Sequence, residues 1–447
     1  MLMPIIGRIS TLLFGMAILI AGHGLQLAYV PLRAELFGWS NLAAGMLGSV
    51  YFSGFLLGCF LVPYLVSRSG HIRSFAALSS LGTASILALA LSENYVFWLA
   101  LRFLVGVSVA GLYLVIESWF NELVVEDNRG TVLAFYTMIA LFAMASGQLL
   151  LKVSPIEDGS LLILAAMLFV AAAIPICLTR TSQPSQIPSA SFSPFLVLRT
   201  STAATIGALI SGLVTGSYYG LAPAYGLQIG LAIDEISTMM ALGIIGGALT
   251  QLPLGRLSDK MDRRIVIFSI MIVGALVSLL MLFSGVEGVP YLMVFYGGCA
   301  MPLYALSLAH ASDNSASSSF LEIGTGLMIV HALGAIVGPL LVAQAMSLIG
   351  AHAFFIVNGL ILMLGGSAIF VLTKIRGSAR EHFTEFEMAT TVSAQGAITL
   401  DPRVESEFDE ADLGEVPQEV PQEVPQEVPQ EVPQEVPQEV PQEVPQE

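Results

Sequence analysis

Five residues between positions 102 and 117 share one face of a predicted helix and place a charge at each end of that face. They are Arg102, Gly106, Ala110, Tyr113 and Glu117, at helical spacings of 4, 4, 3 and 4 residues. The surrounding segment is apolar, and an arginine inside a bilayer costs about 2.5 kcal/mol or more unless it is paired or hydrated. This face predicts a cavity lining in which Arg102 holds an anionic group or steers a proton from a neighbouring carboxylate. The alternative is a structural arginine bonded to helix-end carbonyls.

A short basic segment between two long apolar runs recurs at half the length of the apolar chain. Residues 255–264 read Gly-Arg-Leu-Ser-Asp-Lys-Met-Asp-Arg-Arg, and a degenerate counterpart, residues 63–72, lies 192 positions earlier. Under this offset Arg68 corresponds to Lys260. The short segment predicts a tight turn between two membrane-spanning helices. Its repetition indicates two duplicated helix bundles, an architecture typical of secondary transporters.

Further candidates for contact with a ligand lie in other apolar segments. His23 and Gln26 are three residues apart and therefore adjacent on one helix face. Gln26 corresponds to Tyr218 under the 192-residue offset, so Tyr218 is a candidate as well. A histidine titrates near neutral pH and could carry a coupling proton, although a buried histidine can equally be a bonded structural group. His331 precedes Gly334 by one turn, so it contacts either a ligand or a close helix neighbour.

The basic turns also carry residues that predict a conformational latch, which holds the outward-open state and must break for the two halves to rock. Asp259 is expected to accept bonds from the unpaired N–H groups at a neighbouring helix start. Arg263 and Arg264 are expected to pair with acidic groups across the interface between the halves, and Glu117 is expected to pair with a basic turn residue such as Arg68. The predicted latch comprises Gly255, Asp259, Lys260, Arg263, Arg264, Arg68 and Glu117. The alternative is that these charges only fix the topology.

The composition excludes a water-soluble protein over most of the chain. Of 447 residues, 55% are hydrophobic and 11% are charged, and the mean hydropathy is +0.80. The net charge of −16 comes from residues 379–447, which hold 2 basic and 18 acidic side chains, whereas residues 1–378 hold 15 of each. Cys59, Cys177 and Cys299 lie in apolar segments without paired spacing. Neither a disulfide framework, a metal site nor a cofactor is predicted.

Twelve apolar segments are long enough to cross a bilayer, since a helical span takes roughly 20 residues. They are 10–31, 42–66, 74–92, 95–119, 130–152, 160–179, 200–222, 235–255, 264–284, 288–311, 322–348 and 350–374. Glycine-rich stretches such as 243–247 predict surfaces for close helix packing. The predicted fold class is an all-α integral membrane protein with twelve transmembrane helices in two pseudo-symmetric six-helix halves. The predicted domains are the N-terminal half at 1–179, a cytoplasmic linker at 180–199, the C-terminal half at 200–375 and a tail at 376–447.

The distribution of lysine and arginine predicts the orientation in the membrane. With both termini in the cytoplasm, the inner segments hold 13 basic residues, whereas the outer loops hold only Arg33 and Lys152. Cytoplasmic loops carry the excess of positive charge in membrane proteins. The sequence therefore predicts a multi-pass protein of the cell (inner) membrane with both termini cytoplasmic.

The C-terminal tail predicts a disordered, acidic segment. From Val416 to Glu447 the unit Val-Pro-Gln-Glu repeats eight times. Proline at every fourth residue forbids regular helix or sheet, and the charge resists collapse. The tail is either a docking strip for a cytoplasmic partner or a repeat expansion that is tolerated because it is soluble.

The basic turn carries a resemblance to a known family. The pattern Gly-x-Leu-x-Asp-Lys-x-x-Arg-Arg within 255–264 resembles the signature loop between helices 8 and 9 of the major facilitator superfamily. Asp262 stands where the family usually has glycine, and in the first half Ser67 replaces the signature aspartate. The pattern Arg-x-x-x-Gly-x-x-x-Ala at 102–110 resembles the fourth-helix motif of the same superfamily.

The stretch Glu-Ser-Trp-Phe-Asn-Glu at 117–122, followed by Asn-Arg-Gly at 128–130, is similar to the YcaD-like subgroup. The resemblance covers about residues 10–375 and implies that helices 1 and 7 line a central cavity, to which His23, Gln26 and Tyr218 then contribute. The fifth segment lacks the Gly-Pro pair that drug/proton antiporters of this superfamily usually carry. This absence disfavours drug efflux.

These features together predict a secondary active transporter, and not an enzyme, that moves a small organic solute by alternating access. No ATP-binding loop of the type Gly-x-x-x-x-Gly-Lys-[Ser/Thr] occurs, so an ion gradient is the expected energy source. Protons are favoured over sodium because of Arg102, Glu117 and His23. The predicted partners are the solute, H+, membrane lipids and, for the tail, a cytoplasmic protein; no nucleic acid is expected. The alternative is a non-transporting scaffold or sensor of the same fold that signals through its tail.

Overall fold

The computed structural model describes residues 2–123, 129–178, 200–313 and 320–375, and every regular element in these ranges is a helix. All of these helices belong to one compact unit. The predicted linker at 180–199 and the predicted tail at 376–447 lie outside the described residues.

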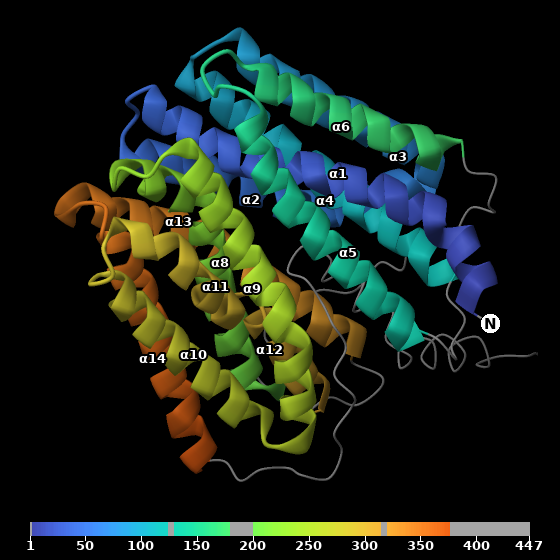
Figure 1. The fold of residues 1–447 in the computed structure, drawn as a ribbon. Coiled ribbons are helices and arrows are strands. Elements are labelled where there is room, and N and C mark those ends of the chain that lie inside the picture. The colour runs from blue at the N-terminus through green and yellow to red at the C-terminus, as the bar shows by residue number, and fades with distance from the viewer. Residues whose placement is uncertain (1, 124–128, 179–199, 314–319, 376–447) are drawn as a thin grey trace, which may run out of the picture. The chain divides into compact units, whose positions relative to one another are not determined.

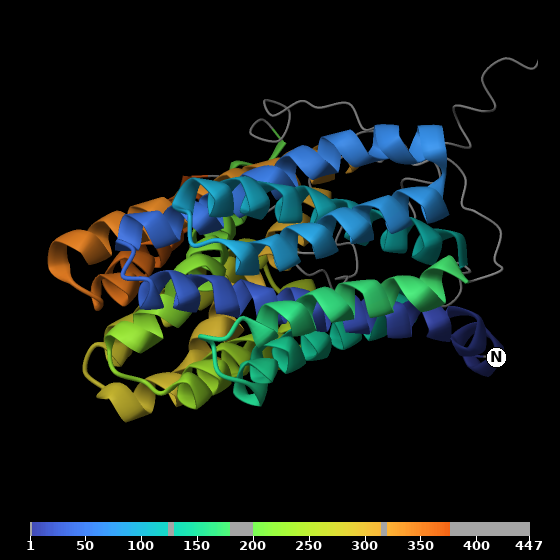
Figure 2. The same cartoon turned by 90° about the horizontal axis from the view of Figure 1, so that it is seen from above.

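Six long helices form the N-terminal half, coloured blue to green in Figure 1. They are α1 (Leu2–Leu36), α2 (Asn41–Ser69), α3 (His71–Ala88), α4 (Tyr95–Leu123), α5 (Arg129–Leu149) and α6 (Ser160–Cys177), with short 3₁₀ helices η1 (Leu89–Leu91) and η3 (Leu150–Val153). α1 packs along α6 and α5, and the view from above shows α1 and α6 side by side (Figure 2).

The C-terminal half repeats this arrangement and is coloured green to red in Figure 1. Its helices are α8 (Thr202–Gln228), α9 (Ile233–Lys260), α10 (Arg263–Met281), η4 (Val286–Gly288), α11 (Val289–Ala300), α12 (Leu303–Asp313), α13 (Phe320–Ile349) and α14 (Ala353–Ile375). Pro302 lies between α11 and α12, where its missing N–H cannot continue the ladder of the preceding helix. The tenth predicted span is therefore two consecutive helices.

Eleven segments in the described part of the chain are long and apolar enough to cross a membrane. The remaining predicted span, the seventh at 200–222, is α8. It falls short only in apolarity, because its 27 residues suffice for a bilayer at 1.5 Å per residue. Nearly all of α8 is buried among other helices. Its Thr215 and Ser217 hydroxyls donate to carbonyl oxygens one turn earlier, which satisfies them away from water. The predicted all-α, twelve-helix fold is confirmed.

The basic turn between α9 and α10 is shorter than the sequence predicts. Gly255–Lys260 continues α9, and the turn itself consists of Met261 and Asp262. Asp262 caps α10, because its carboxylate accepts a hydrogen bond from the N–H of Arg264. In the first half α2 likewise continues to Ser69 before Gly70 turns the chain with a φ of 82°. The prediction that residues 255–264 form the turn is wrong, because helical hydrogen bonding continues beyond the apolar run.

Helix backbones approach closely where glycines face a neighbouring helix. A Cβ atom at Gly106 of α4 would overlap the carbonyl oxygen of Tyr51 on α2. The predicted packing surface at 243–247 is confirmed, because a Cβ at Gly246 of α9 would overlap the carbonyl oxygen of Val294 on α11. Small residues of this kind let helices in a membrane gain dispersion contacts that bulkier residues would prevent.

The two halves contact each other mainly through α1 with α8, α2 with α8, α2 with α13, and α5 with α9. In the α2–α13 contact the hydroxyl of Ser49 donates to the carbonyl oxygen of Ile336 at 2.6 Å. Beside it, Gly48 and Gly220 bring α2 and α8 so close that a Cβ at Gly48 would lie 3.1 Å from the Gly220 Cα. This contact is a direct backbone approach between the halves.

Polar side chains join the halves at one end of the bundle. We call this the opposite end, because it carries the turn at 37–40, and we call the end with Met261 and Asp262 the basic-turn end. Gln228 Nε2 donates to Asn41 Oδ1 at 2.5 Å and to Glu35 Oε2 at 2.9 Å, Lys152 Nζ donates to Thr238 Oγ1 at 2.9 Å, and Ser237 Oγ donates to the Gln148 carbonyl oxygen at 2.8 Å. These bonds fasten the two halves together at the opposite end.

Replacing Gly106 with valine is expected to lower the free energy of unfolding by at least about 1–3 kcal/mol, because the added side chain must push α4 away from the Tyr51 carbonyl. Thermal unfolding of the purified protein in detergent measures this change. Gly288→Ala is the control. Gly288 is the last residue of the short helix η4, and the nearest atom to its new Cβ is the Ser284 side-chain Cβ at 3.1 Å, not the backbone of a neighbouring helix. Equal unfolding temperatures for both variants would contradict the close crossing of α2 and α4.

Candidate functional site

Arg102 is buried in α4 and contacts two other helices of the N-terminal half. Its exposed fraction is 2%. One terminal nitrogen of the guanidinium donates to Gln26 Oε1 on α1, and the guanidinium carbon lies 4.5 Å from the centre of the Tyr51 ring on α2. The first contact uses a neutral amide and the second the negative face of an aromatic ring. The structure therefore brings Arg102 and Gln26 together as predicted candidates for one site.

His23 lies between two tyrosine hydroxyls. Its Nδ1 is 2.8 Å from Tyr113 Oη, and its Nε2 is 2.7 Å from Tyr51 Oη. A neutral imidazole donates from one nitrogen and accepts at the other, so one hydroxyl accepts from the ring while the other donates to it. We call His23, Gln26, Tyr51, Arg102 and Tyr113 the central polar cluster. Four of its members are predicted site residues.

Tyr51 connects the parts of the central polar cluster, and the sequence analysis missed it. Its ring lies under Arg102 and its hydroxyl bonds to His23. No motif marks it, and the one available signal was a tyrosine ten residues inside an apolar helix, where the hydroxyl needs a partner. Its contacts depend on the packing of α2 against α4, which a linear pattern does not specify.

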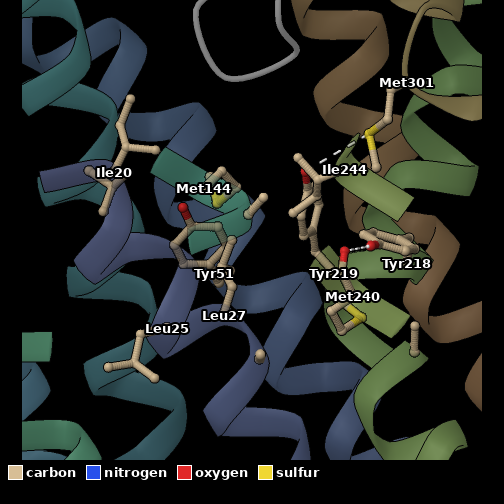
Figure 3. Close-up of a cluster of buried hydrophobic side chains, with 14 of the residues drawn as sticks. Ile20, Leu25, Leu27, Tyr51, Met144, Tyr218, Tyr219, Met240, Ile244 and Met301 are labelled. Carbon is tan, nitrogen blue, oxygen red and sulfur yellow. Dashed lines mark hydrogen bonds between the residues drawn. The ribbon is translucent and has the colours of Figure 1, made fainter. Parts of the chain in front are cut away.

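Tyr219 of α8 lies across the boundary between the halves from Tyr51 of the central polar cluster (Figure 3). Figure 3 shows Tyr51 and Tyr219 on the two sides of the boundary between the halves, in one buried apolar cluster. The Tyr219 hydroxyl lies 3.9 Å from the Met301 sulfur. Its neighbour Tyr218, a predicted ligand contact, points elsewhere, since its hydroxyl donates to the Met240 carbonyl oxygen within its own half.

His331 lies apart from the central polar cluster in the described contacts. It is buried in α13, and its ring centre is 5.0 Å from that of Tyr304 on α12. A Cβ at Gly212 of α8 would overlap the His331 carbonyl oxygen, so the backbone at this position forms a close helix contact. The backbone of His331 therefore lies against a close helix neighbour, as one of the two alternatives predicted. Contact of its side chain with a ligand stays a prediction.

Glu117 and Arg68, the predicted pair of the first half, have different described partners. Glu117 is 3% exposed, and its Oε1 accepts a hydrogen bond from the Tyr136 hydroxyl at 3.3 Å. Arg68 is exposed and donates to the Tyr64 hydroxyl on its own helix at 3.4 Å. Glu117 therefore connects α4 to α5, while Arg68 extends along the surface of α2.

A buried ion-pair network joins three helix ends at the basic-turn end of the C-terminal half. Arg263 is fully buried, its Nε lies 2.7 Å from Asp313 Oδ2 and its Nη2 lies 3.1 Å from Asp259 Oδ1. Its Nη1 donates to Ser258 Oγ at 2.9 Å. These contacts connect the start of α10 with the ends of α9 and α12. The described partner of Asp259 is therefore the side chain of Arg263. The sequence predicted that Asp259 would accept from backbone N–H groups at a helix start.

Arg264 forms a second ion pair in the same turn. Its Nη2 lies 2.7 Å from Asp262 Oδ2. The described partners of Arg263 and Arg264 all belong to their own half, because the short turn places Asp259 and Asp262 next to the guanidinium groups. The expected pairing across the interface stays a prediction. Gly255 is buried in α9 and Lys260 is exposed at its end.

The first half has uncharged side chains in the positions of this network. Ser67 and His71 occupy the positions of Asp259 and Arg263 under the 192-residue offset. His71 is buried at the start of α3, with its ring centre 5.9 Å from that of Trp119. The duplicated halves therefore share a fold at this end without sharing its charges.

Burial tends to raise the pKa of the Asp262 carboxyl, but the hydrogen bonds and the positive charge of Arg264 outweigh it and hold that pKa below its ordinary value. The charged form of Asp262 is thus favoured in the folded protein. Within the ranges that the structure describes, no group of three or more His, Cys, Asp or Glu side chains is placed to hold a metal ion.

Comparisons with known proteins agree with this architecture. A sequence model of the Major Facilitator Superfamily matches residues 12–232 and 204–404. "Uncharacterized MFS-type transporter YcaD" from Escherichia coli K12 (strain DH10B) and from O157:H7 (strain EC4115) is 30% identical over 372 residues in each case, which covers 83% of this chain and 96% of the relative.

Two solved structures share the fold. The nucleoside transporter NupG has a TM-score of 0.68 at 12% identity and covers 82% of this chain and 99% of its own. A bacterial homologue of the human lysosomal transporter Spinster, in an inward-facing and unoccupied conformation, has a TM-score of 0.60 at 14% identity and covers 88% and 96%. At these identities the likeness shows the fold alone.

Replacing Asp262 with asparagine is expected to destabilise the protein at neutral pH by no more than about 1 kcal/mol, because asparagine still caps α10 and solvent screens the lost ion pair. The folded-state pKa of Asp262 lies below the unfolded one. Its charge therefore stabilises the fold above the unfolded value of about 3.9, and this contribution is lost as the pH falls through the folded-state pKa.

Unfolding temperatures of the wild type and Asp262→Asn, measured between neutral and acidic pH, should therefore converge as the pH falls. A difference that stays constant over this range would contradict a role for the charge of Asp262.

Proposed function

This chain belongs to the major facilitator superfamily, and we propose that it moves a small organic solute across the cell membrane by alternating access, driven by a proton gradient. The observation that carries the proposal is the central polar cluster. It lies within membrane-length helices, is buried, and faces Tyr219 of the other half. Polar groups are costly at such a depth and mark solute and ion pathways in membrane proteins.

The contacts between the halves support alternating access. The two halves are hydrogen-bonded at the opposite end through Gln228, Lys152 and Ser237. Under the predicted topology the opposite end faces away from the cytoplasm. The solute would then reach the central polar cluster from the cytoplasmic side in this state, and transport requires these bonds to break as the halves rock.

His23 is the proposed site of the coupled proton. In the neutral ring one nitrogen accepts a hydrogen bond, whereas a protonated ring donates from both. Proton uptake would therefore oblige either Tyr51 or Tyr113 to turn its hydroxyl into an acceptor. Because these tyrosines stand on α2 and α4, protonation of His23 would be transmitted to the helices that surround Arg102.

The sequence predicts a latch that must break as the halves rock, whereas the described partners of Arg263 support a latch that keeps helix ends together while the halves move. Arg263 links Asp259 and Asp313 and so ties α9, α10 and α12 into one body. We extend this role to Gly255, Lys260 and Arg264 in the same turn, and to Arg68 and Glu117 in the first half. A rigid C-terminal half would transmit a change at the solute site to the opposite end.

The first experiment is a thermal-unfolding screen of the purified protein against metabolites at pH 6 and 7.5, since a ligand that binds the folded state stabilises it by mass action. A stabilising solute is then followed into proteoliposomes. We expect uptake against its gradient when a proton gradient is imposed and loss of that accumulation with a protonophore. His23→Gln should bind the solute without accumulating it, whereas His352→Gln, at an exposed position, should behave as the wild type.

Truncation of residues 404–447 separates the proposal from its alternative, a scaffold or sensor that signals through the tail. The degenerate turn of the first half, in which Ser67 replaces the signature aspartate, favours that alternative. Transport by the truncated protein at the wild-type rate supports a transporter with an appended tail. A folded protein that neither binds nor moves any solute in the screen would contradict transport.

Locking the opposite end should stop transport. In a variant without native cysteines, Asn41→Cys and Gln228→Cys place two thiols where side chains now meet at 2.5 Å. Oxidation is expected to abolish uptake and reductant to restore it, because the halves can no longer separate there. The single-cysteine variants are the controls. Full uptake by the oxidised double variant, with the disulfide verified, would contradict alternating access at this end.

A further inference from the structure

Arg102 differs from the other buried arginines in its charge balance. Arg263 pairs with Asp259 and Asp313, and Arg264 pairs with Asp262. Arg102 contacts a neutral amide and an aromatic ring, and no carboxylate forms an ion pair with it in the described part of the chain. A guanidinium at this depth is stabilised when a negative charge comes to it.

Arg102 and Gln26 each carry one unused hydrogen-bond donor. Arg102 Nε and Gln26 Nε2 are buried and have no acceptor among the described residues. The two side chains are already bonded to one another through other atoms, because Arg102 Nη1 donates to Gln26 Oε1. Nε lies on an edge of the guanidinium that fits the two oxygens of a carboxylate. Both unused groups donate, so their missing partner is an acceptor.

The surroundings restrict the ligand to a single negative charge. The side chains at the boundary are aromatic and apolar, with Tyr51 and Met144 on one side and Tyr219, Ile244 and Met301 on the other (Figure 3). Arg102 is the buried cation without an ionic partner among the described residues. While His23 is neutral, a phosphate ester with two charges would therefore be left partly uncompensated. An apolar body suits the remaining surface.

We infer that the solute is a monocarboxylate with an apolar body, its carboxylate bound by Arg102 Nε and Gln26 Nε2. This inference rests on the proposed transport function and deepens it. The N-terminal half supplies the donors for the carboxylate, and the apolar body extends towards Tyr219 of the C-terminal half. The ligand thereby contacts both moving parts.

The test uses purified full-length protein and isothermal titration with benzoate and hexanoate. Their neutral counterparts, benzamide and hexanamide, have nearly the same shape and lack the charge, and phenyl phosphate carries a second charge. We expect at least one carboxylate to bind about 30-fold or more tightly than its amide. An amide leaves the buried charge of Arg102 unpaired, and the penalty for that corresponds to at least this ratio of affinities. Phenyl phosphate should bind more weakly than benzoate.

Variants identify the residues that make this difference. Arg102→Gln should remove the preference for carboxylate over amide, and Arg102→Lys should recover only part of it, since a lysine lacks the planar fork. Gln26→Met removes one donor, together with the amide oxygen that accepts from Arg102, at similar volume. It should reduce carboxylate affinity about tenfold, the effect of one charge-assisted hydrogen bond. Arg33→Gln is the matched control, because Arg33 also lies over an aromatic ring, Phe37, at 4.3 Å, but is paired with Glu93.

The outcomes separate this inference from the function on which it rests. Equal affinity for the carboxylates and their amides, a preference for phenyl phosphate, or a carboxylate preference that survives both Arg102→Gln and Gln26→Met would overturn it. If the protein then takes up a neutral solute, the proposed transport function is still supported. Carboxylate binding that depends on Arg102, without uptake under any ion gradient, would instead retain the site and contradict transport. If Arg102→Gln does not fold, Gln26→Met decides.

Discussion

A guanidinium inside a membrane-length helix constrains the helices around it. Arg102 is tolerated because Gln26 of α1 accepts one of its hydrogen bonds and the Tyr51 ring of α2 covers its charge. Tyr51 in turn bonds to His23, which bonds to Tyr113. One costly charge therefore fixes the mutual placement of three helices and creates the polar centre of an otherwise apolar bundle.

Close backbone contact makes this placement feasible. Gly106 of α4 admits the Tyr51 carbonyl of α2, so the two helices that supply the guanidinium and its aromatic cover cross without intervening side chains. Between the halves the same device brings Gly48 near Gly220. Since lipid supplies no hydrophobic force to press helices together, small residues and short hydrogen bonds hold the bundle.

The duplicated halves keep one fold with different chemistry. At the basic-turn end the C-terminal half relies on the charges of Asp259, Arg263 and Asp313, whereas Ser67 and His71 stand at two of these positions in the first half. The central polar cluster, in contrast, belongs to the first half, because all of its members lie on α1, α2 and α4. Duplication has therefore preserved the arrangement of the helices without preserving which buried polar residues each half carries.

The sequence alone determined the order, type and approximate bounds of the helices, because apolar length and turn residues act locally. The segment predicted at 264–284, for example, is α10, and the Arg102 face follows from helical periodicity. Only the tertiary structure decided which polar groups meet, such as Tyr51 with His23 or Arg263 with Asp313. Adjacent residues on a helix differ by about 100° in direction, so Tyr219 faces the boundary and Tyr218 its own half. The packing of helices far apart in the chain sets that direction.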